Sequence, residues 1–486
     1  MSEDAPGNPG AGAGWPEARA ARVTVRRMQA KLHQWAGEDS GRQFGDLYNL
    51  VCDPAFLVMA WERVAGNEGA RTAGIDRATV AQIKAGPGAE GFLRRVREDL
   101  KARTFQPVEV RRVMIPKAGG KLRKLGIPTV ADRVVQASLK LVLEPLFEAD
   151  FHPSSYGFRP GRRAHDAIAE IHHHATHGYE WVLEADITAC FDEISHPALM
   201  GRVRERIKDK RVLALVKAFL KSGVLMQAGQ REETVSGTPQ GGILSPLLAN
   251  IALSALDEHF QARWDAHGSA ARRSRHRRNG GATCRLVRYA DDFVVMVAGT
   301  GAHADALKDE ISTVLAPMGL RLSEAKTGTA HIDEGFDFLG FHIQRRRKRG
   351  TSKRHVYTTP SKKSIQNIKA AVRRLTARST TNMPVRALLM RLNSILQGWA
   401  NYFRHAVAKR VFSAIDSCAW WQAVHWIRCK HHRLTWKELR RRFTAPNGRI
   451  TADGITLTGA SKIRITRYRF RGYKIPAPWT TQAATI

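Results

Sequence analysis

The sequence has 486 residues, of which 78 are lysine or arginine and 44 are aspartate or glutamate, so its formal net charge at pH 7 is +34. A charge of this sign and size attracts polyanions, which makes nucleic acid the expected partner and disfavours acidic partners. Because 43% of the residues are hydrophobic, the composition excludes an intrinsically disordered chain. At roughly 150 residues per domain, the length predicts about three domains.

The cysteines and the hydropathy pattern indicate the compartment. The five cysteines are Cys52, Cys190, Cys284, Cys418 and Cys429. They include no C-x-x-C pair, which argues against a disulfide framework, a zinc ribbon and a redox motif. No run approaches the roughly 18 apolar residues of a membrane span, and the first residues do not resemble a signal peptide. We therefore expect reduced cysteines, a cytoplasmic location and no membrane partner.

The N-terminal hundred residues divide into a tail and a helical region. Residues 1 to about 20 are rich in Gly, Ala and Pro with almost nothing to bury, so we expect a disordered tail and lead-in over 1–40. From Phe44 to about Leu100, apolar residues recur at spacings of three and four, which predicts helices. A loop over 67–76 interrupts them.

The middle of the chain mixes two periodicities. Helical stretches such as Arg133–Leu146 alternate with short β-type runs. These runs are Val108–Ile115, Trp181–Ile187, Arg285–Val297 and Phe338–Ile343. The mixture predicts an α+β region. After about Arg345 the strand signals fade and amphipathic helices follow. The basic runs Arg272–Arg278 and Arg345–Arg349 are expected to be solvated loops, and the second is expected at a hinge between domains.

Acidic residues stand where the β-type runs end. In the stretch RLVRYADDFVVMV (285–297), two apolar runs flank Asp291 and Asp292, which places these acids at the tip of a predicted hairpin. The strand WVLEAD ends at Asp186, a third carboxylate that could lie beside them in one sheet. Clustered carboxylates need a cation, and hard oxygen ligands favour Mg²⁺. Asp-Asp at a turn is by itself ordinary turn chemistry, but the third acid favours a two-metal phosphoryl-transfer site.

Several motifs resemble, in order, those of the reverse transcriptase/maturase family encoded by bacterial group II introns. YADD is similar to the reverse transcriptase signature. The other blocks are VMIPKAGGKLRKLGIPTVADRVVQ (113–136), YGFRPGRRAHDAI (156–168), DITACFD (186–192), GTPQGGILSPLLANI (237–251), LSEAKT (322–327) and FLGF (338–341). The resemblance extends to NEGARTAGID (67–76) and to the maturase segment LNSILQGWANYFR (392–404), and covers about residues 44 to 480.

The resemblance implies roles for individual residues. Asp186, Asp291 and Asp292 match the catalytic carboxylates, and Ile187 joins them in the implied metal-binding set for two Mg²⁺ ions, with Mn²⁺ as a substitute. The implied nucleotide-binding residues are Lys117, Arg123, Phe191, Gln240 and Lys326. Lys117 and Arg123 would grip the dNTP triphosphate, Phe191 would exclude a 2′-hydroxyl, and Lys326 would protonate pyrophosphate. Gln240 would line the nucleotide pocket beside glycines that allow close approach. The alternatives are that Lys117 and Arg123 are ordinary surface charges, that Phe191 is a core residue, and that the glycines beside Gln240 only form a turn.

The basic and aromatic residues of the C-terminal third suit RNA. We expect RNA contacts from Arg345, Arg346, Arg347, Lys348, Arg349 and Arg404. The tryptophans at 399, 420, 421, 426 and 436 could stack on unpaired bases, although helical spacing makes most of them core residues. A zinc site among Cys418, His425, Cys429, His431 and His432 matches no common finger spacing. His172–His174 are expected on an exposed helix face.

Together these patterns predict an α+β right-hand polymerase, with fingers and palm, followed by an all-α thumb/maturase domain. The expected boundaries are 41–344 for fingers and palm, 345–455 for the thumb/maturase region (domain X), and 456–486 for a short basic DNA-binding-like tail. The expected function is RNA-directed DNA synthesis coupled to group II intron splicing and retrohoming, with intron RNA, RNA template and DNA primer or target DNA as partners. We expect no HNH endonuclease domain. Alternatives are a host-adopted reverse transcriptase and a splicing factor with little polymerase activity.

Overall fold

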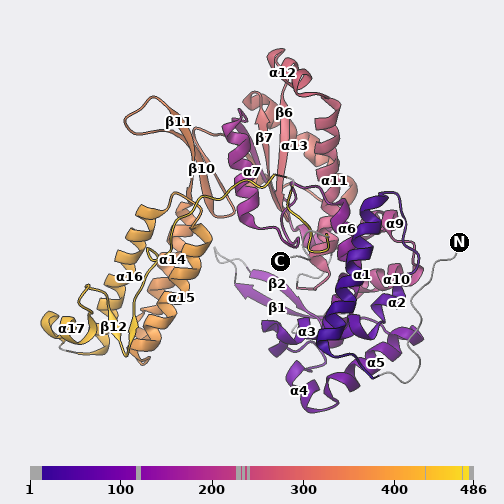
Figure 1. The fold of residues 1–486 in the computed structure, drawn as a ribbon, viewed down its shortest axis with the longest axis horizontal. Coiled ribbons are helices and arrows are strands. Elements are labelled where there is room, and N and C mark those ends of the chain that lie inside the picture. The colour runs from indigo at the N-terminus through magenta and orange to yellow at the C-terminus, as the bar shows by residue number, and fades with distance from the viewer. Residues whose placement is uncertain are drawn as a thin grey trace.

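The computed structural model describes residues 14–116, 122–225, 231–232, 236–237, 241–432, 434–472 and 474–480. Figure 1 shows two lobes, a larger α+β lobe and a smaller helical lobe that extends from it. Within the described ranges, no helix combines the length and the apolar character that crossing a bilayer requires. The predicted α+β region followed by a helical region is confirmed, and its parts position the acidic residues as follows.

The first helix, α1 (Ala18–Glu38), packs against the larger lobe, so the expectation of a disordered lead-in over 1–40 is wrong from Ala18 onward. Its buried positions are Ala21, Val25, Gln29, Leu32 and Ala36. They recur every three to four residues and form one stripe that faces α3 and α6. Two of the five are alanines and one is a glutamine, so the stripe is weak in hydropathy although it is fully buried.

The fingers region combines helices with a small sheet. Its helices are α2 (Tyr48–Val51), α3 (Pro54–Gly66), η1 (Glu68–Arg71), α4 (Val80–Ala85), α5 (Gly88–Ala102) and the long buried α6 (Val130–Asp150). Its sheet has the strand order β2-β1-β4-β5, from β1 (Val110–Pro116), β2 (Leu122–Ile127), β4 (Val224–Leu225) and β5 (Arg231–Glu232). The expected helices between 44 and 100 and the break at 67–76 are confirmed in outline. Because β1 and β2 pair as antiparallel strands, the basic residues Arg111, Arg112, Arg123 and Lys124 lie on two adjacent strands.

The palm sheet has the strand order β6-β7-β3-β8, from β3 (Trp181–Asp186), β6 (Thr283–Tyr289), β7 (Asp292–Ala298) and β8 (Gly328–His331). Helices cover both faces, namely α7 (Ala164–Thr176) on one and α11 (Ser245–Ala266) with α13 (Gly301–Leu315) on the other. Alternate side chains therefore enter different cores. Val182 and Val294 pack with α7, whereas Leu183 and Val295 pack with α11 and α13.

Shorter elements connect these layers. They are α8 (Cys190–Glu193), α9 (His196–Arg206), α10 (Lys210–Lys221), α12 (Ala270–Arg278), η2 (Ala316–Met318) and η3 (Glu324–Lys326). The basic run Arg272–Arg278, expected as a loop, lies in the helix α12, where Ser269 caps the N-terminus through the Arg272 amide at 3.3 Å. No residue of α12 is buried, and four of its arginines, at 272, 275, 277 and 278, are exposed; the helix itself lies at the top of Figure 1.

A three-stranded sheet joins the two lobes. It consists of β9 (Phe336–Phe338), β10 (Phe341–Arg347) and β11 (Arg354–Pro360) in the order β11-β10-β9. Strand structure therefore continues to Pro360, and the expectation that it fades at about Arg345 is wrong. Polar and basic residues occupy the outer half of this hairpin, which hides the strand signal because only Val356 and Pro360 of β11 are buried.

The helical lobe follows Ser361, whose hydroxyl caps its first helix at 3.2 Å from the Ser364 amide. Its elements are α14 (Lys362–Leu375), η4 (Arg378–Thr380), α15 (Val385–Phe403), α16 (Lys409–Lys430), α17 (Trp436–Phe443), β12 (Thr451–Ala452) and β13 (Ile455–Thr456). A separate core fills it, and the largest fully buried side chain there is Trp426. Near the palm, however, Ala400, Phe403 and Phe412 pack in a core that the lobe shares with the palm sheet.

The last described residues return from the helical lobe to the palm, and we call residues 461–472 and 474–480 the C-terminal strap (yellow in Figure 1). Asp416 of α16 fixes its start by accepting the Ser461 amide at 2.9 Å. On α7, the Asp166 carboxylate accepts from Tyr468 Oη at 2.8 Å and from Arg471 Nη2 at 2.7 Å. These bonds tie the strap to both lobes.

The strap also covers histidines and reaches the first helix. Phe470 stacks on His173 of α7, with ring centroids 4.7 Å apart. At the far end, Trp479 Nε1 donates to Gln29 Oε1 of α1 at 3.2 Å. Within 172–174, His174 is buried and its two neighbours are half-buried. The expectation of an exposed helix face there is therefore wrong.

Candidate active site

Three carboxylates meet at one edge of the palm sheet. Asp186 ends β3, Asp292 begins β7, and the two are paired residues in the antiparallel register of these strands. Asp291 lies in the tight turn between β6 and β7, one residue earlier. The hairpin predicted over 285–297 is present with the acids at its tip, so the sequence prediction that Asp186, Asp291 and Asp292 converge is confirmed as geometry.

The electrostatics of this edge are those of crowded, desolvated acids. Burial raises the pKa of Asp291 above its usual range. Burial, with the neighbouring charge of Asp291 and a hydrogen bond to Asp186, likewise raises the pKa of Asp292. The ammonium of Lys326, in η3, donates to Asp186 Oδ2, and this bond raises the pKa of Lys326. The cluster therefore favours a nearby positive charge.

The donor chemistry of the cluster suits a hard cation such as Mg²⁺, because all three side chains offer carboxylate oxygens. In the described part of the chain, no group of three His, Cys, Asp or Glu side chains is already arranged to hold a metal ion. At the aspartates, the Lys326 ammonium supplies the neutralising charge through Asp186. A cation held by all three carboxylates would therefore compete with Lys326 for Asp186.

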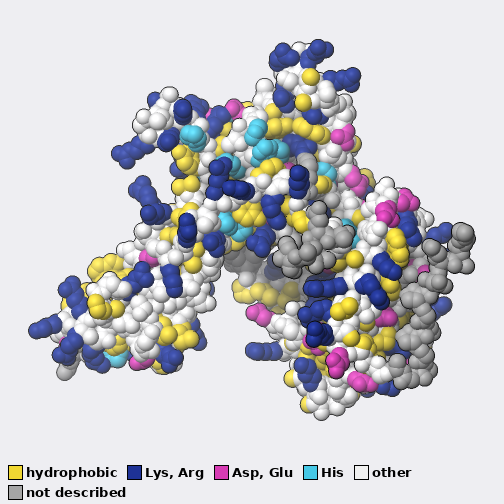
Figure 2. Space-filling model, viewed as in Figure 1, with side chains coloured by type: hydrophobic (Ala, Val, Ile, Leu, Met, Phe, Trp, Pro, Cys, Tyr) yellow, Lys and Arg dark blue, Asp and Glu magenta, His cyan; other side chains and the backbone are white. Residues whose placement is uncertain are grey.

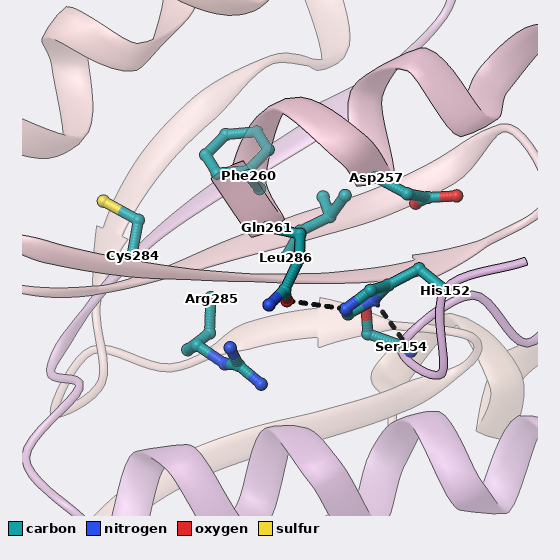
Figure 3. A pocket seen from close by; sticks show the side chains of 8 residues that line it. All are labelled: His152, Ser154, Asp257, Phe260, Gln261, Cys284, Arg285 and Leu286. Carbon is teal, nitrogen blue, oxygen red and sulfur yellow. Dashed lines mark hydrogen bonds between the residues drawn. The ribbon is translucent and has the colours of Figure 1, made fainter. Parts of the chain in front are cut away.

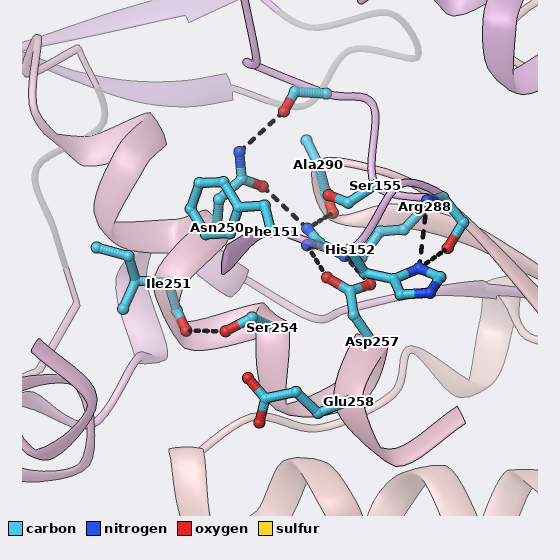
Figure 4. Close-up of polar contacts among 12 residues, drawn as sticks. Phe151, His152, Ser155, Asn250, Ile251, Ser254, Asp257, Glu258, Arg288 and Ala290 are labelled. Atoms are coloured by element: carbon cyan, nitrogen blue, oxygen red, sulfur yellow. Dashed lines mark hydrogen bonds and ion pairs between the residues drawn. The ribbon is translucent and has the colours of Figure 1, made fainter. Parts of the chain in front are cut away.

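A buried polar network supports the turn from behind (Figure 4). Arg288 of β6 is 0% exposed and forms an ion pair with Asp257 of α11, whose side chain is 1% exposed. Its Nε donates to Asp257 Oδ1 at 2.9 Å, and its Nη1 donates to Asn250 Oδ1 at 2.9 Å and to the Ala290 carbonyl at 3.1 Å. Ala290 adopts a positive φ of 60°, a conformation that non-glycine residues rarely hold without support. The network thus holds the residue immediately before Asp291.

A second support comes from the segment that precedes α7. Asn250 Nδ2 donates to the Gly157 carbonyl at 2.9 Å, which links this segment to Arg288. A Cβ atom at Gly157 would lie only 2.2 Å from the Ala290 nitrogen. Glycine is therefore required for the close approach of this backbone to the Tyr-Ala-Asp-Asp turn.

A small cavity beside this network contains none of the three aspartates (Figure 3). Its volume is about 10 Å³, room for one water-sized sphere, and its lining includes His152, Ser154, Asp257 and Gln261. His152 lies 2.8 Å from Gln261 Oε1 and 2.7 Å from Ser154 Oγ, and burial lowers the pKa of its imidazole. The cavity is part of the support for the sheet edge and is too small to be a substrate site.

The predicted nucleotide-binding residues are only partly described. Arg123 of β2 is exposed, and its charge lowers the pKa of Asp291 against the larger effect of burial, which places it near the carboxylates. Lys117 and Gln240 lie outside the described residues. Beside the latter, Gly241 has a φ of 115°, and a Cβ there would lie 2.5 Å from the Gly126 carbonyl oxygen. Glycine is therefore required at 241 for the close approach of this backbone to β2, and the role of the segment in nucleotide binding stays a prediction.

Phe191 lies in α8. This helix begins directly after Ala189, which has a positive φ of 44°. Its side chain is buried and meets Phe158 edge-on, with ring centroids 6.2 Å apart. Phe158 is 49% exposed and also has a positive φ, 58°, next to Gly157. The sequence analysis missed Phe158, and the only signal for it is an aromatic residue within a segment rich in Gly, Pro and Arg.

The basic run at 345–349 has unequal roles. Arg345 forms ion pairs with Glu180 and with Asp333, the latter at 2.6 Å, so its charge joins β10 to the palm. Arg347 Nε donates to the Thr351 carbonyl at 2.8 Å within the hairpin tip. Arg349 is exposed there. Arg345 is therefore a structural residue that links two elements, and not a charge in a solvated loop.

Two other predictions concern single groups in the helical lobe. Arg404 follows α15, and its carbonyl accepts the Thr466 amide of the strap at 2.9 Å. On α16, Cys429 Sγ and His425 Nε2 lie 3.5 Å apart. No third His, Cys, Asp or Glu among the described residues completes a metal site with them.

Comparison with known protein families divides the chain as the fold does. Residues 115–343 match the model described as reverse transcriptase (RNA-dependent DNA polymerase). Residues 365–443 match the model described as the group II intron maturase-specific domain. The first match contains the three aspartates and the network around Arg288, and the second contains most of the helical lobe.

Individual relatives agree with this division. Protein YkfC of Escherichia coli is 36% identical over 364 residues, which cover 70% of this chain and 94% of YkfC. The group II intron-encoded protein LtrA of Lactococcus lactis subsp. cremoris is 32% identical over 65% of this chain and 59% of its own length. An uncharacterized 91 kDa protein in a cob intron of Schizosaccharomyces pombe is 30% identical over 74% of this chain and 51% of its own length. The chain thus spans nearly all of one relative and little more than half of the others.

Proposed function

Because the chain belongs to the family of reverse transcriptases and maturases encoded by bacterial group II introns, and is an RNA-directed DNA polymerase, we propose that it copies its parent intron RNA into cDNA and assists the splicing of that RNA. The observation that carries the proposal is the convergence of three carboxylates at one sheet edge, in a chain that continues into a maturase-type lobe. The RNA would catalyse its own splicing, and the protein would stabilise the competent RNA fold.

Asp186, Asp291 and Asp292, together with the main-chain carbonyl of Ile187, would hold two Mg²⁺ ions, with Mn²⁺ as a substitute. The side chain of Ile187 is apolar and buried, so only its backbone can contribute. Bound ions of this kind activate a primer 3′-hydroxyl and stabilise the leaving pyrophosphate. The protein groups then have defined tasks: the carboxylates orient the reacting oxygens, and the buried Arg288 network keeps Asp291 in place.

Residues around the carboxylates would bind the incoming dNTP. We assign the triphosphate to Lys117 and Arg123, since a guanidinium can bind phosphate oxygens in a bidentate manner. Phe191 would exclude the ribose 2′-hydroxyl, supported by its packing on Phe158, and Gln240 would line the pocket. Lys326 would protonate the leaving pyrophosphate, a role supported by its 59% exposed side chain beside the carboxylates.

The RNA would lie along the basic surfaces that flank the palm. Figure 2 shows dark blue side chains at the tip of the β10–β11 hairpin, on α12 and over the helical lobe. We assign phosphate contacts to the exposed members of 346–349 and a further contact to Arg404. Fingers and palm would occupy 41–344, the thumb and maturase region 345–455, and the DNA-binding-like tail 456–486.

The decisive experiment separates polymerisation from RNA binding. Asp291→Asn removes one metal ligand without altering the basic surface, so we expect dNTP incorporation on a primed RNA template to be abolished, while affinity for the intron RNA and its splicing stay unchanged. Asp309→Asn, an exposed aspartate on α13, is the matched control and should retain both activities. Persistent incorporation by Asp291→Asn would refute the carboxylate assignment, and loss of splicing would refute the separation of the two functions.

The RNA partner is tested by purifying the protein from its native host in mild salt and sequencing the RNA bound to it. Enrichment of the transcript that surrounds its own gene, with spliced and lariat junctions, is the expected result. Enrichment of unrelated RNAs would refute the assignment to a parent intron and leave the polymerase assignment intact.

A further inference from the structure

A surface pocket of about 650 Å³ lies on the helical lobe between α16, α17 and the turn that follows α17. It is separate from the carboxylate edge, and its lining includes Trp420 and Trp436, two of the tryptophans that the sequence suggests as stacking platforms. Its lining residues are Trp420, Trp436, Leu439, Arg440, Arg441, Thr444, Ala445, Pro446 and Gly448. A volume of this size is typical of pockets that bind small organic groups.

Two indole rings line the pocket, and they differ in burial. Trp420 is partly buried against the core of the helical lobe, whereas Trp436 is 40% exposed and its neighbour Trp421 is 57% exposed. Trp420 Nε1 donates to the Gly448 carbonyl at 3.1 Å, which fixes this ring against the turn. Because exposed indoles lose the free energy of burial, a cluster of them beside a pocket indicates a binding surface.

The charge around the pocket is almost entirely positive. Between residues 420 and 450 the basic residues are Arg428, Lys430, Arg433, Lys437, Arg440, Arg441, Arg442 and Arg449. The only acid in this stretch is Glu438, and its carboxylate is already bonded to the Thr435 amide and hydroxyl at the start of α17. The Arg428 guanidinium lies 5.6 Å from the Trp436 ring centroid. In Figure 2, yellow side chains lie among dark blue ones over this part of the lobe.

We propose that this pocket binds an unpaired nucleotide of RNA, with the base stacked on the exposed indole of Trp436 and the flanking phosphates held by Arg440 and Arg441. Aromatic rings interleaved with cations are what recognition of single-stranded nucleic acid requires, since every base has a π-face and every nucleotide a phosphate. The excess of positive charge favours this occupant over a protein segment. The inference rests on the proposed maturase function and adds to it a site for an unpaired nucleotide.

The test uses the full chain and two fluorescent probes, a single-stranded RNA dodecamer and the corresponding RNA duplex, with anisotropy measured at fixed salt. Trp436→Ala should weaken binding of the single strand about 5- to 150-fold, the range for loss of one stacked base, and leave duplex binding unchanged. Trp436→Phe, which keeps a ring, should retain most of the affinity. Trp436 is the first residue of α17 and Thr435 provides the cap, so the helix should survive the change.

Two further variants distinguish stacking from loss of exposed apolar surface and from charge. Met390→Ala, at a 52% exposed side chain of α15 outside the pocket, should have no effect on either probe. Arg440→Ala should reduce the salt dependence of single-strand binding by about one phosphate contact. A single strand that contains 4-thiouridine should cross-link to the peptide that carries Trp436.

Undiminished binding of the single strand by Trp436→Ala, or an equal loss for the duplex, would overturn the pocket assignment, as would failure of the wild-type chain to bind the single strand. Each of these results leaves the maturase proposal standing if the wild-type chain still binds and splices its intron. If the wild-type chain neither binds its intron nor assists its splicing, the maturase proposal fails, whatever the result with the RNA dodecamer.

Discussion

The ion pair between Arg288 and Asp257 offers a test of how the catalytic turn is held. Asp257→Asn removes the negative charge while keeping the size of the side chain. Because both partners are inaccessible to water, Arg288 would then carry an uncompensated buried charge. Breaking a buried pair on one side costs about 3–5 kcal/mol, which for a domain of this size lowers Tm by roughly 6 to 20 °C.

The double replacement Arg288→Met with Asp257→Leu separates stability from positioning. Apolar residues of similar volume should recover most of the lost stability, because neither charge then needs to be desolvated. The Ala290 carbonyl, however, loses the donor that lies 3.1 Å away, and Asn250 loses its link to Arg288. If Asp291 shifts by about 1 Å, kcat should fall on the order of 10²-fold, with little change in KM for the dNTP.

The assay is thermal unfolding beside steady-state dNTP incorporation on a primed RNA template, both with the single and double variants. Wild-type kcat in the double variant would refute the positioning role and leave the pair a purely structural feature. An unchanged Tm in Asp257→Asn would refute the reasoning about the buried charge itself.

Three further predictions concern the same scaffold. Gly157→Ala should lower kcat because the new methyl group would lie 2.2 Å from the Ala290 nitrogen, whereas Gly201→Ala on α9, where the added Cβ meets nothing within 4 Å, should be silent in the same incorporation assay. Lys326→Met should lower the Mg²⁺ concentration for half-maximal rate by roughly two- to five-fold, since an exposed ion pair no longer competes for the carboxylates, and an unchanged Mg²⁺ titration would contradict this. Arg471→Ala should weaken the C-terminal strap by about 1–3 kcal/mol and speed its removal by trypsin, and equal cleavage rates would show that this contact does not hold it.

The catalytic carboxylates could be predicted from the sequence because their geometry is local. Two apolar runs that flank Asp291 and Asp292 specify a hairpin, and a third apolar run ends at Asp186. Neighbouring strands and a tight turn then leave few ways to arrange three acids at one edge. The supports of the turn have no such signal, since Arg288 meets Asn250 and Asp257 across more than thirty residues of chain.

The wrong predictions for α1, β11 and His173 share a physical cause. In each case the residues are buried or paired by segments that lie far away in the sequence. In α1, Ala21 and Ala36 are too small to indicate a core stripe, yet α6 buries them. The residues of β11 look like a polar loop because much of their stabilisation comes from pairing with β10. His173 appears to be a surface residue until the strap returns from some three hundred residues later to stack Phe470 on it.

The C-terminal strap changes the mechanics of the helical lobe. A lobe attached only through β11 could rotate freely about that one connection. Here the strap that leaves the lobe is attached as well, through Arg471 to the palm and through Trp479 to α1, the first helix of the chain. Two attachments define an axis, so the lobe is expected to rock about the line between them and not to swing away. α1 and the last described residues of the strap would then together form one of the two pivots of this motion.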